Sequence, residues 1–403
     1  MDLASATQRQ TAKDQTDSPI DRARSVLDVI TAEATRSETI GRLTDEAFTA
    51  LHAAGLFGLL IPRCFGGLEA GAVEALETLE MLCAADGSTG WIVMACNVGT
   101  GTAATYLPDA GAKAVFGKHI PVIAGQGAPR GRAVADGDGY RLSGQWSYGS
   151  GLLHAEYLHT GGMLFENGKP SRALTFIVPV KQVNFLGNWD VVGLRATGSV
   201  DYALDNVYVP KDFTHSPNTL EPLRGSNVYR MGIVGLTPLG HGAFALGVAR
   251  RILNELVLLA KSAEGRPTPV ADGVMGEGFL EGYGIAEEKL RAGRAFLYEV
   301  YGDAEMTIRR GDPIAMRQIS LMRLALNHVT TAAAEICTFA YRTGGGVALR
   351  NGILQRCFRD MMAGTQHRIV STKMLRECSR ELLGLAEGKL WTSAGLVNDA
   401  GSG

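Results

Sequence analysis

The chain has 403 residues, of which 46% are hydrophobic and 20% charged, and its formal net charge is −2. This length predicts two or three packed units rather than one simple core. The near-neutral charge argues against a nucleic-acid partner and against binding to an anionic membrane surface. Six scattered cysteines without a C-x-x-C pair predict reduced thiols, and the polar N-terminus lacks the apolar segment of a signal peptide. We therefore expect a soluble, cytoplasmic protein without a membrane span.

The first part of the chain has helical patterns. Residues 1–19 are polar and are predicted to be a disordered tail. The Thr-Asp-Glu run at 44–46 is typical of a helix start, because a hydroxyl caps the helix and acidic groups favour its first turn. A later helix is expected to be capped by Ser88 or Thr89. We predict that 20–117 form a helical domain.

Around residue 120 the pattern changes to short runs with alternating polar and apolar residues, separated by glycine and aspartate. Such alternation is typical of strands with one buried face. We predict a β unit over 118–215 with seven or eight strands, closed as a small barrel or packed as a sandwich. Its clearest strand segments are 140–151, 157–165, 172–180 and 201–210.

Helical patterns return after the β unit. Long helices in sequence, separated by glycine and proline, favour an up-down bundle, here expected over 216–392. The last residues, 393–403, are predicted to form a tail. The whole chain is therefore expected to have an α+β organisation. The four helical segments of the bundle are 230–262, 278–309, 313–342 and 353–386.

The stretch 344–367 combines a glycine loop, a helix expected to begin near Ile353, and His367. In a continuous helix, Ala363 and Gly364 would lie one turn before His367 on the same face. Two such small side chains beside an imidazole leave room for a planar or bulky group. The alternative is close helix packing around a hydrogen-bonded core histidine.

Several familiar site types are disfavoured. GTGTAA at 99–104 fits G-x-G-x-x-A, but a dinucleotide site needs a preceding strand and an acidic residue about 20 positions later, and 115–125 contain none. His154 and His159 are five apart, so a strand would point them to opposite faces. No Walker loop, G-x-S-x-G or H-E-x-x-H motif is present. We expect no metal site.

Three stretches carry groups suited to a polar ligand. An aromatic and several hydroxyls at 145–155 could bond a polar ring edge, although a strand turning a corner has the same composition. The turn at 193–199 offers a guanidinium and hydroxyls, or is simply a hairpin. Gln355, Arg356 and Arg359 beside the glycine loop suit a phosphate, or form a solvated helix face.

Taken together, five segments in the same order resemble the acyl-CoA dehydrogenase-like flavoproteins, from about residue 20 to 390. The resemblance implies a helical N-terminal domain, a central β-barrel, a C-terminal four-helix bundle and a homotetramer. It also implies a flavin whose isoalloxazine lies between the β unit and the bundle. The segments are FGLLIPRCFGG, AADGSTGW, GQWSYGSG, GLRATGSVDYALDNVYVP and LQRCFRDMMAGTQH.

The resemblance also separates two activities. A dehydrogenase of this family needs a carboxylate base at one of two positions, which here are occupied by Ala363 and Arg230. Neither side chain can accept a proton, and a lost general base typically costs 10²–10⁴-fold in rate. The motifs at 88–91, 150–155 and 363–367 are instead similar to those of the oxygenase components of two-component flavin monooxygenases.

That similarity implies hydroxylation of an aromatic or heteroaromatic small molecule through a flavin C4a-hydroperoxide. The oxygenase would use O2 and diffusible reduced FMN or FAD, delivered by a separate NAD(P)H-flavin reductase. Two alternatives stay open. One is an acyl-CoA dehydrogenase-type oxidoreductase with a displaced base, and the other is a non-catalytic flavin-binding member of the family.

By the same resemblance, His367 and Ser150 are the expected catalytic residues. Trp91, Asn97 and His154 are expected to bind substrate together with His367. Some relatives carry a histidine eight residues after the tryptophan, where this chain has Gly99. The expected flavin-binding residues are Trp146, Ser147, Tyr148, Ser150, Arg195, Thr197, Gly344, Gly345, Gln355, Arg359, Gly364 and Thr365.

Overall fold

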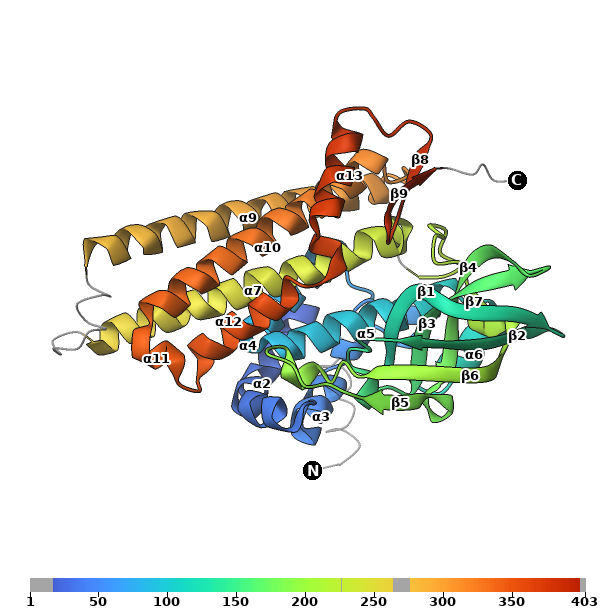
Figure 1. Cartoon of the computed structure of the whole chain (residues 1–403), viewed down its shortest axis with the longest axis horizontal. Coiled ribbons are helices and arrows are strands. Elements are labelled where there is room, and N and C mark those ends of the chain that lie inside the picture. The colour runs from blue at the N-terminus through green and yellow to red at the C-terminus, as the bar shows by residue number, and fades with distance from the viewer. Residues whose placement is uncertain (1–16, 226, 264–275, 399–403) are drawn as a thin grey trace, which may run out of the picture.

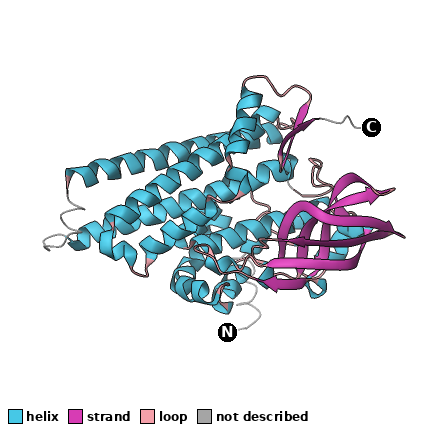
Figure 2. Ribbon diagram, in the orientation of Figure 1, coloured by secondary structure: helices cyan, strands magenta, loops and turns pink. Residues whose placement is uncertain are grey.

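The computed structural model describes residues 17–225, 227–263 and 276–398. Most of the predicted N-terminal tail therefore lies outside the described residues. Within them, N-terminal helices are followed by one large sheet and then by long helices (Figure 1). Figure 2 shows that the long helices lie beside one another on one side of the molecule and the large sheet on the other. This arrangement confirms the predicted α+β order of helices, strands and helices.

The N-terminal helices begin where polar side chains cap them. Thr44 accepts the backbone N–H of Ala47, as the sequence predicted. The expected cap at Ser88 or Thr89 is wrong, because the extended backbone of Asp86 places its carboxylate over the helix start two residues earlier. These helices are α2 (Pro19–Ile40), α3 (Asp45–Ala53), α4 (Ala72–Ala85), α5 (Gly87–Tyr106) and α6 (Asp109–Phe116).

The large sheet has seven strands in the order β5-β6-β2-β1-β3-β4-β7, with β1 and β3 parallel and the other pairs antiparallel. The expected closed barrel is not found. Among the described residues the edge strands β5 and β7 do not pair with each other, and β7 is only two residues long. The strands are β1 (Ile123–Asp136), β2 (Gly139–Trp146), β3 (Tyr157–Glu166), β4 (Lys169–Pro179), β5 (Asn184–Gly187), β6 (Asp201–Pro210) and β7 (Thr214–His215).

The C-terminal part begins with three long helices where the sequence predicted them. The fourth predicted helix, 353–386, is wrong in its length, because it breaks after Gly364. A short hairpin follows, with β8 (Lys389–Thr392) at the end of the predicted bundle and β9 (Gly395–Asn398) within the predicted C-terminal tail. The helices are α7 (Gly232–Ala263), α9 (Glu277–Arg309), α10 (Met316–Thr343), α11 (Gly345–Leu349), α12 (Ile353–Gly364) and α13 (Thr372–Leu382).

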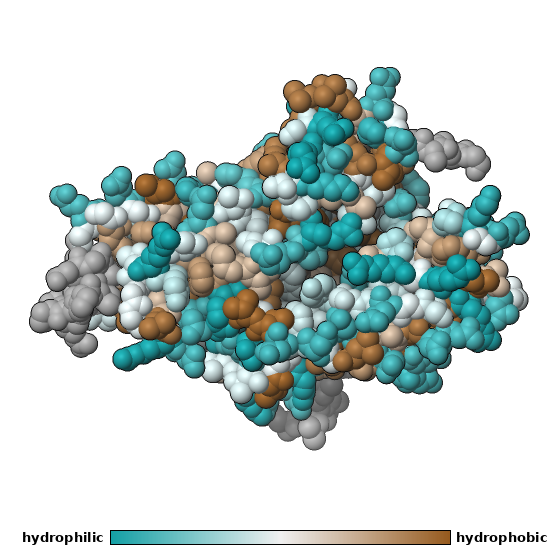
Figure 3. Space-filling view, viewed as in Figure 1, coloured by the Kyte–Doolittle hydropathy of each residue, from teal (hydrophilic) through white to brown (hydrophobic). Residues whose placement is uncertain are grey.

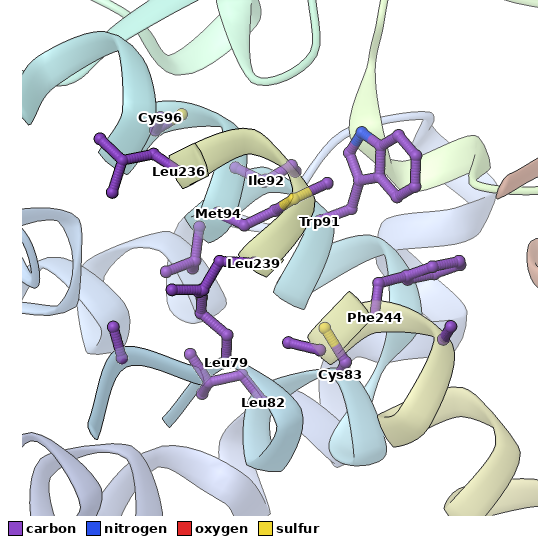
Figure 4. Packing of buried hydrophobic residues seen from close by; sticks show 14 of the residues in the cluster. Leu79, Leu82, Cys83, Trp91, Ile92, Met94, Cys96, Leu236, Leu239 and Phe244 are labelled. Atoms are coloured by element: carbon purple, nitrogen blue, oxygen red, sulfur yellow. The ribbon is translucent and has the colours of Figure 1, made fainter. Parts of the chain in front are cut away.

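Glycines allow helices α4, α5 and α7 to approach closely around a buried apolar cluster (Figure 4). A Cβ at Gly90 on α5 would collide with the Cys83 side chain on α4. A Cβ at Gly247 on α7 would lie 2.5 Å from the backbone carbonyl oxygen of Glu80, also on α4. The cluster therefore fixes the positions of α5 and α7 relative to each other.

The surface carries polar and apolar residues interspersed on the face shown in Figure 3, with an apolar patch over the tip of α13. Leu383, directly after that helix, is 73% exposed. Among the described residues, no helix combines the length and hydropathy that crossing a membrane requires.

We predict that Gly247→Ala destabilises the protein by about 1–3 kcal/mol, because the added methyl group overpacks a contact with backbone that cannot move aside cheaply. The matched control is Gly302→Ala within α9, where the new Cβ meets nothing within 4 Å. That control should be neutral or stabilise by up to about 1 kcal/mol, since alanine is the better helix former. Urea unfolding of both variants measures the difference, and equal free energies of unfolding would contradict the close packing.

Candidate active site

Trp91 lies in the first turns of α5, at the junction between α5 and the long helix α7. The helix starts at this point because Asp86 Oδ2 accepts the backbone N–H of Thr89 at 2.9 Å. The Trp91 side chain is 8% exposed, and its ring meets Phe244 and His241 edge-on at centroid distances of 4.9 Å each. Figure 4 shows Trp91 and Phe244 on the same side of the apolar cluster. The indole is thus part of a cluster of rings that includes a histidine and a phenylalanine from α7.

A chain of hydroxyl groups continues from the indole nitrogen of Trp91. Trp91 Nε1 donates to Ser150 Oγ at 3.2 Å, and Ser150 Oγ lies 2.7 Å from Ser199 Oγ. Ser199 Oγ in turn lies 2.7 Å from Thr197 Oγ1, which donates to the Leu194 carbonyl. Two sheet loops, after β2 and before β6, therefore meet the start of α5. The predicted residues Trp91, Ser150 and Thr197 are brought together here.

His367 faces a second histidine, His241, with ring centroids 4.2 Å apart and planes inclined by 35°. His241 Nδ1 lies 2.9 Å from the Thr237 carbonyl oxygen, which can only accept, so the neutral ring carries its proton on Nδ1. His367 Nδ1 accepts the backbone N–H of Ile369 at 3.4 Å, so its proton belongs on Nε2. The two rings are therefore in different tautomers. His241 has an acceptor at Nε2, and His367 has a donor at Nε2.

Burial keeps both histidines neutral. It lowers the pKa of His241 to about 4 and holds the pKa of His367 well below its ordinary value, with a further lowering of the latter by His241. Desolvation disfavours the charged form of a base, which explains the direction of both shifts. At neutral pH the pair can accept and donate hydrogen bonds without carrying charge.

The expected helix face below His367 is not formed. Helix α12 ends at Gly364, and His367 precedes a separate 3-10 turn over 368–370. A Cβ at Gly364 would collide with the ring of Phe244. Gly364 therefore allows α12 to pack closely against α7. Close helix packing was the alternative to a space for a planar group.

Helix α12 also holds the loop that carries Thr197 and Ser199. Asp360 is 3% exposed, and its Oδ1 accepts the backbone N–H of Leu194 at 2.6 Å. Next to it, Gly193 lies so close to the Arg359 carbonyl that a Cβ could not fit. Burial, with a contribution from Asp86, raises the pKa of Asp360 to about 7.

Arg359 and Gln355, both expected at the flavin, are engaged by protein groups. Arg359 pairs with Glu38 at 2.6 Å, donates to the Val192 carbonyl at 2.8 Å and contacts the Gln355 amide oxygen at 2.7 Å. The Gln355 amide nitrogen contacts Asn351 at 3.3 Å. These contacts tie α12 to helix α2 and to the loop before β6, so a phosphate would have to compete with them.

Two expected site residues lie inside the core instead. Trp146 is fully buried, donates to the Gly161 carbonyl at 3.0 Å, and stacks on Tyr202 at 5.4 Å. Asn97 is also fully buried, and both ends of its amide bond the backbone of residues 56–60 and Val93. Neither side chain presents an exposed surface to a ligand, which argues against the predicted roles.

The remaining expected residues are dispersed. His154 stacks on Phe48 of α3 at 4.9 Å and is separate from the histidine pair. Tyr148 is 67% exposed, with its ring edge-on to Trp189. Ser147 and Thr365 are half-buried near the loop after β2 and the end of α12, whereas Arg195 is exposed and donates to a carbonyl of its own loop.

Gly344 and Gly345 lie at the opposite end of α12 from Gly364, a separation of about 18 Å for a twelve-residue helix. A hollow of about 760 Å³ opens beside them, lined by residues of α7, α11 and the start of α12. Among the predicted flavin-binding residues, Gly344 and Gly345 therefore form a second group, at the other end of α12 from Gly364 and Thr365.

His241, Ser199 and Phe244 belong to the site but were not among the expected residues. Their signal in the sequence was weak. His241 stands between two glycines in the mostly apolar first half of α7, where a single polar side chain is unusual. Only the fold places it against a histidine 126 positions later.

Comparison with known proteins agrees with this architecture. Residues 20–125 match the N-terminal domain of acyl-CoA dehydrogenase, and residues 239–372 match its C-terminal domain. Indole-3-acetate monooxygenase from Pseudomonas putida is 29% identical over 81% of this chain and 83% of its own. The oxygenase subunit HsaA of a flavin-dependent monooxygenase from Rhodococcus jostii is 31% identical over 47% of this chain and 50% of its own.

Among solved structures, XiaF from a Streptomyces species, in complex with FADH2 and glycerol, superposes with a TM-score of 0.84. It is 21% identical, over 96% of this chain and 98% of its own, and shares the fold. The two matched domains cover more than half of the chain, and the chain belongs to the acyl-CoA dehydrogenase family. Within that family it is a flavin-dependent monooxygenase.

We predict that the protein loses stability as the pH falls from 6.5 towards 4. Burial lowers the pKa of His154, His215 and His241 to about 4 and that of His159 to about 3. The unfolded chain takes up protons on these rings below their ordinary pKa near 6.5, whereas the folded chain does not. The raised pKa of Asp360 acts in the opposite direction, because the folded state binds that proton first.

Urea unfolding at pH 7, 5.5 and 4.5 measures this dependence. The free energy of unfolding should decrease as the pH is lowered. Asp360→Asn should make this decrease steeper, because it removes the carboxyl group that acts in the opposite direction. A free energy that is constant over this range would contradict the neutral state of the buried histidines.

Proposed function

We propose that this chain is the oxygenase component of a two-component monooxygenase and hydroxylates an aromatic or heteroaromatic small molecule with O2 and reduced flavin. One observation carries the proposal. Trp91, Ser150 and His367 converge between the sheet loops and the long helices, around a neutral histidine pair. Within the described part of the chain, the ring and hydrogen-bond contacts of Trp91, His241 and His367 include no carboxylate.

The chemistry of this site fits an isoalloxazine ring. The ring is planar, with a polar edge that both donates and accepts hydrogen bonds. The hydroxyls of Ser150, Ser199 and Thr197 form a continuous chain of such groups at the loop side. We assign the flavin ring to this side of the site and leave FMN and FAD as alternatives.

A homotetramer, which the family resemblance implies, would give the second group of predicted residues a role. Gly344 and Gly345 adjoin the hollow at the far end of α12, about a full helix length from Ser150 and His367. One small cofactor on one subunit would have to reach across that distance. We propose that the hollow of one subunit receives the phosphate end of a flavin whose ring lies in another subunit.

The chain's own residues would perform three tasks. Bound reduced flavin supplies the two electrons that activate O2 and allow transfer of one oxygen atom. Trp91 and Phe244 form apolar walls that exclude water from that oxygen. Ser150 accepts from Trp91 and holds its hydroxyl at a fixed position beside Ser199. His367 keeps a proton on Nε2, from which it donates to the substrate or to the oxygen being transferred.

A separate NAD(P)H-flavin reductase is the proposed source of the reduced flavin. The one stretch with a dinucleotide-like glycine pattern, 99–104, lies within helix α5 rather than in a strand-to-helix loop. The flavin would therefore reach the oxygenase by diffusion, and we propose that both proteins act in the cytoplasm.

The dehydrogenase alternative would need a carboxylate base at the site. Asp360 has a suitable pKa, raised to about 7, but its carboxylate is buried against the Leu194 backbone and faces Gly87. Ala363 and Arg230 occupy the positions where the family places such a base. The geometry therefore favours oxygenation over proton abstraction.

Isotope labelling tests the proposed function. With photoreduced FMN or FAD, ¹⁸O2 and indole, the purified protein should give a hydroxylated product carrying one ¹⁸O atom. His367→Ala should lower the product formed per flavin oxidised by roughly 10²-fold or more, a typical effect of losing a proton-transfer group. His328→Ala, an exposed histidine of α10, is the matched control and should change nothing. A product with oxygen from water, or full yield from His367→Ala, would contradict the proposal.

A further inference from the structure

His241 presents a nitrogen that the proposed mechanism leaves unused. Its Nδ1 is bound to the carbonyl of Thr237, one turn earlier in its own helix, at 2.9 Å. Nε2 lies on the outer part of the ring, away from that carbonyl. It is buried and has no hydrogen-bond partner among the described residues, and His241 as a whole is only 9% exposed. A buried acceptor without a partner is costly and calls for an explanation.

The surroundings of the His241 ring are those of the candidate active site. Trp91 packs edge-on against it at 4.9 Å, and His367 faces it at 4.2 Å. A Cβ at Gly240 would meet Met94, and one at Gly242 would meet Leu297, so the two flanking glycines let α7 pack closely on both sides of the histidine. The ring is therefore held in position by its neighbours and by its own helix.

The hydrogen-bonding character of Nε2 is fixed by the same geometry. Because Nδ1 carries the proton, Nε2 holds a lone pair and can only accept. The charged groups near the pair do not change this state. Arg368 is the cation that acts on His367, and it disfavours protonation, as does burial of both rings. An arriving N–H or O–H group would thus find an acceptor that has already lost its water.

We propose that His241 is a substrate-binding residue that selects an aromatic substrate with an N–H or O–H donor, which it accepts at Nε2. This inference rests on the proposed function and adds the substrate class to it. The donor would lie beside Trp91, whose ring offers an apolar face to an aromatic substrate. A substrate of the same shape without a donor would leave Nε2 unpaired, and a site built around a buried acceptor discriminates against such a ligand.

The test compares indole with benzothiophene, two bicyclic ligands of similar shape of which only indole has an N–H donor. Binding of each to the full chain with reduced flavin is measured anaerobically by calorimetry, so that no turnover is needed. The informative quantity is the ratio of the two affinities, because it removes effects common to both ligands. In His241→Phe the preference for indole should fall by roughly 5–10-fold relative to the wild type, the effect of one buried hydrogen bond.

His241→Gln is the conservative variant, because its amide oxygen can accept the same donor, and it should retain part of the indole preference. An affinity ratio that is the same within twofold in the wild type and His241→Phe overturns the proposal, as does an absence of indole binding to the wild type. Reduced-flavin binding, titrated separately in each protein, distinguishes the two hypotheses. If the wild type does not bind reduced flavin, the proposed function is refuted. If it binds reduced flavin but the ratio of indole to benzothiophene affinity is the same in His241→Phe, only the role of His241 is refuted.

Discussion

The site depends on one buried carboxylate, that of Asp360. A carboxylate out of water is costly unless polar groups surround it, and this one is compensated by the Leu194 backbone N–H at 2.6 Å. The bond fixes the loop before β6 against helix α12, where Gly193 permits contact with the Arg359 carbonyl. Because the same loop carries Ser199 and Thr197, the hydroxyl chain is positioned relative to the bundle. The Arg359 bond to the Val192 carbonyl at 2.8 Å holds the same loop against α12.

Desolvation is the second constraint, and it works in the same region. The histidine pair is neutral because both rings are buried, and its tautomers are set by backbone groups on either side. A neutral pair can hold a proton on His367 and a lone pair on His241 at the same pH. A solvent-exposed pair would gain protons near neutral pH and would hydrogen-bond to water instead.

Much of the fold could be predicted from periodicity. Helices α7, α9 and α10 and strands β2, β3, β4 and β6 are long enough for their patterns to dominate, and Thr44 caps its helix through a local bond. The helical pattern of 353–386 hid the break after Gly364, where the chain leaves α12 and forms a separate 3-10 turn over 368–370. The open sheet is likewise decided by a two-residue edge strand rather than by any local pattern.

Part of the candidate site could also be proposed from the sequence. Trp91, Ser150, Thr197 and His367 stand in motifs that can be compared one by one, and the fold brings them together. His241 belongs to no such motif and becomes meaningful only beside His367. Trp146 and Asn97 show the opposite case. Their positions in the motifs suggested that they bind flavin or substrate. In the structure their N–H groups instead donate to backbone carbonyl groups in the core.

The most direct test of the account is the reaction of the bound reduced flavin with oxygen. The protein is titrated anaerobically with photoreduced FMN and FAD, and the complex is mixed with oxygenated buffer in a stopped-flow spectrometer. We predict saturable binding of one of the two flavins, followed by a transient absorbing species distinct from both reduced and oxidised flavin. Direct conversion to oxidised flavin at the rate of free flavin, with no transient even when indole is present, would contradict the assignment of this site to oxygenation.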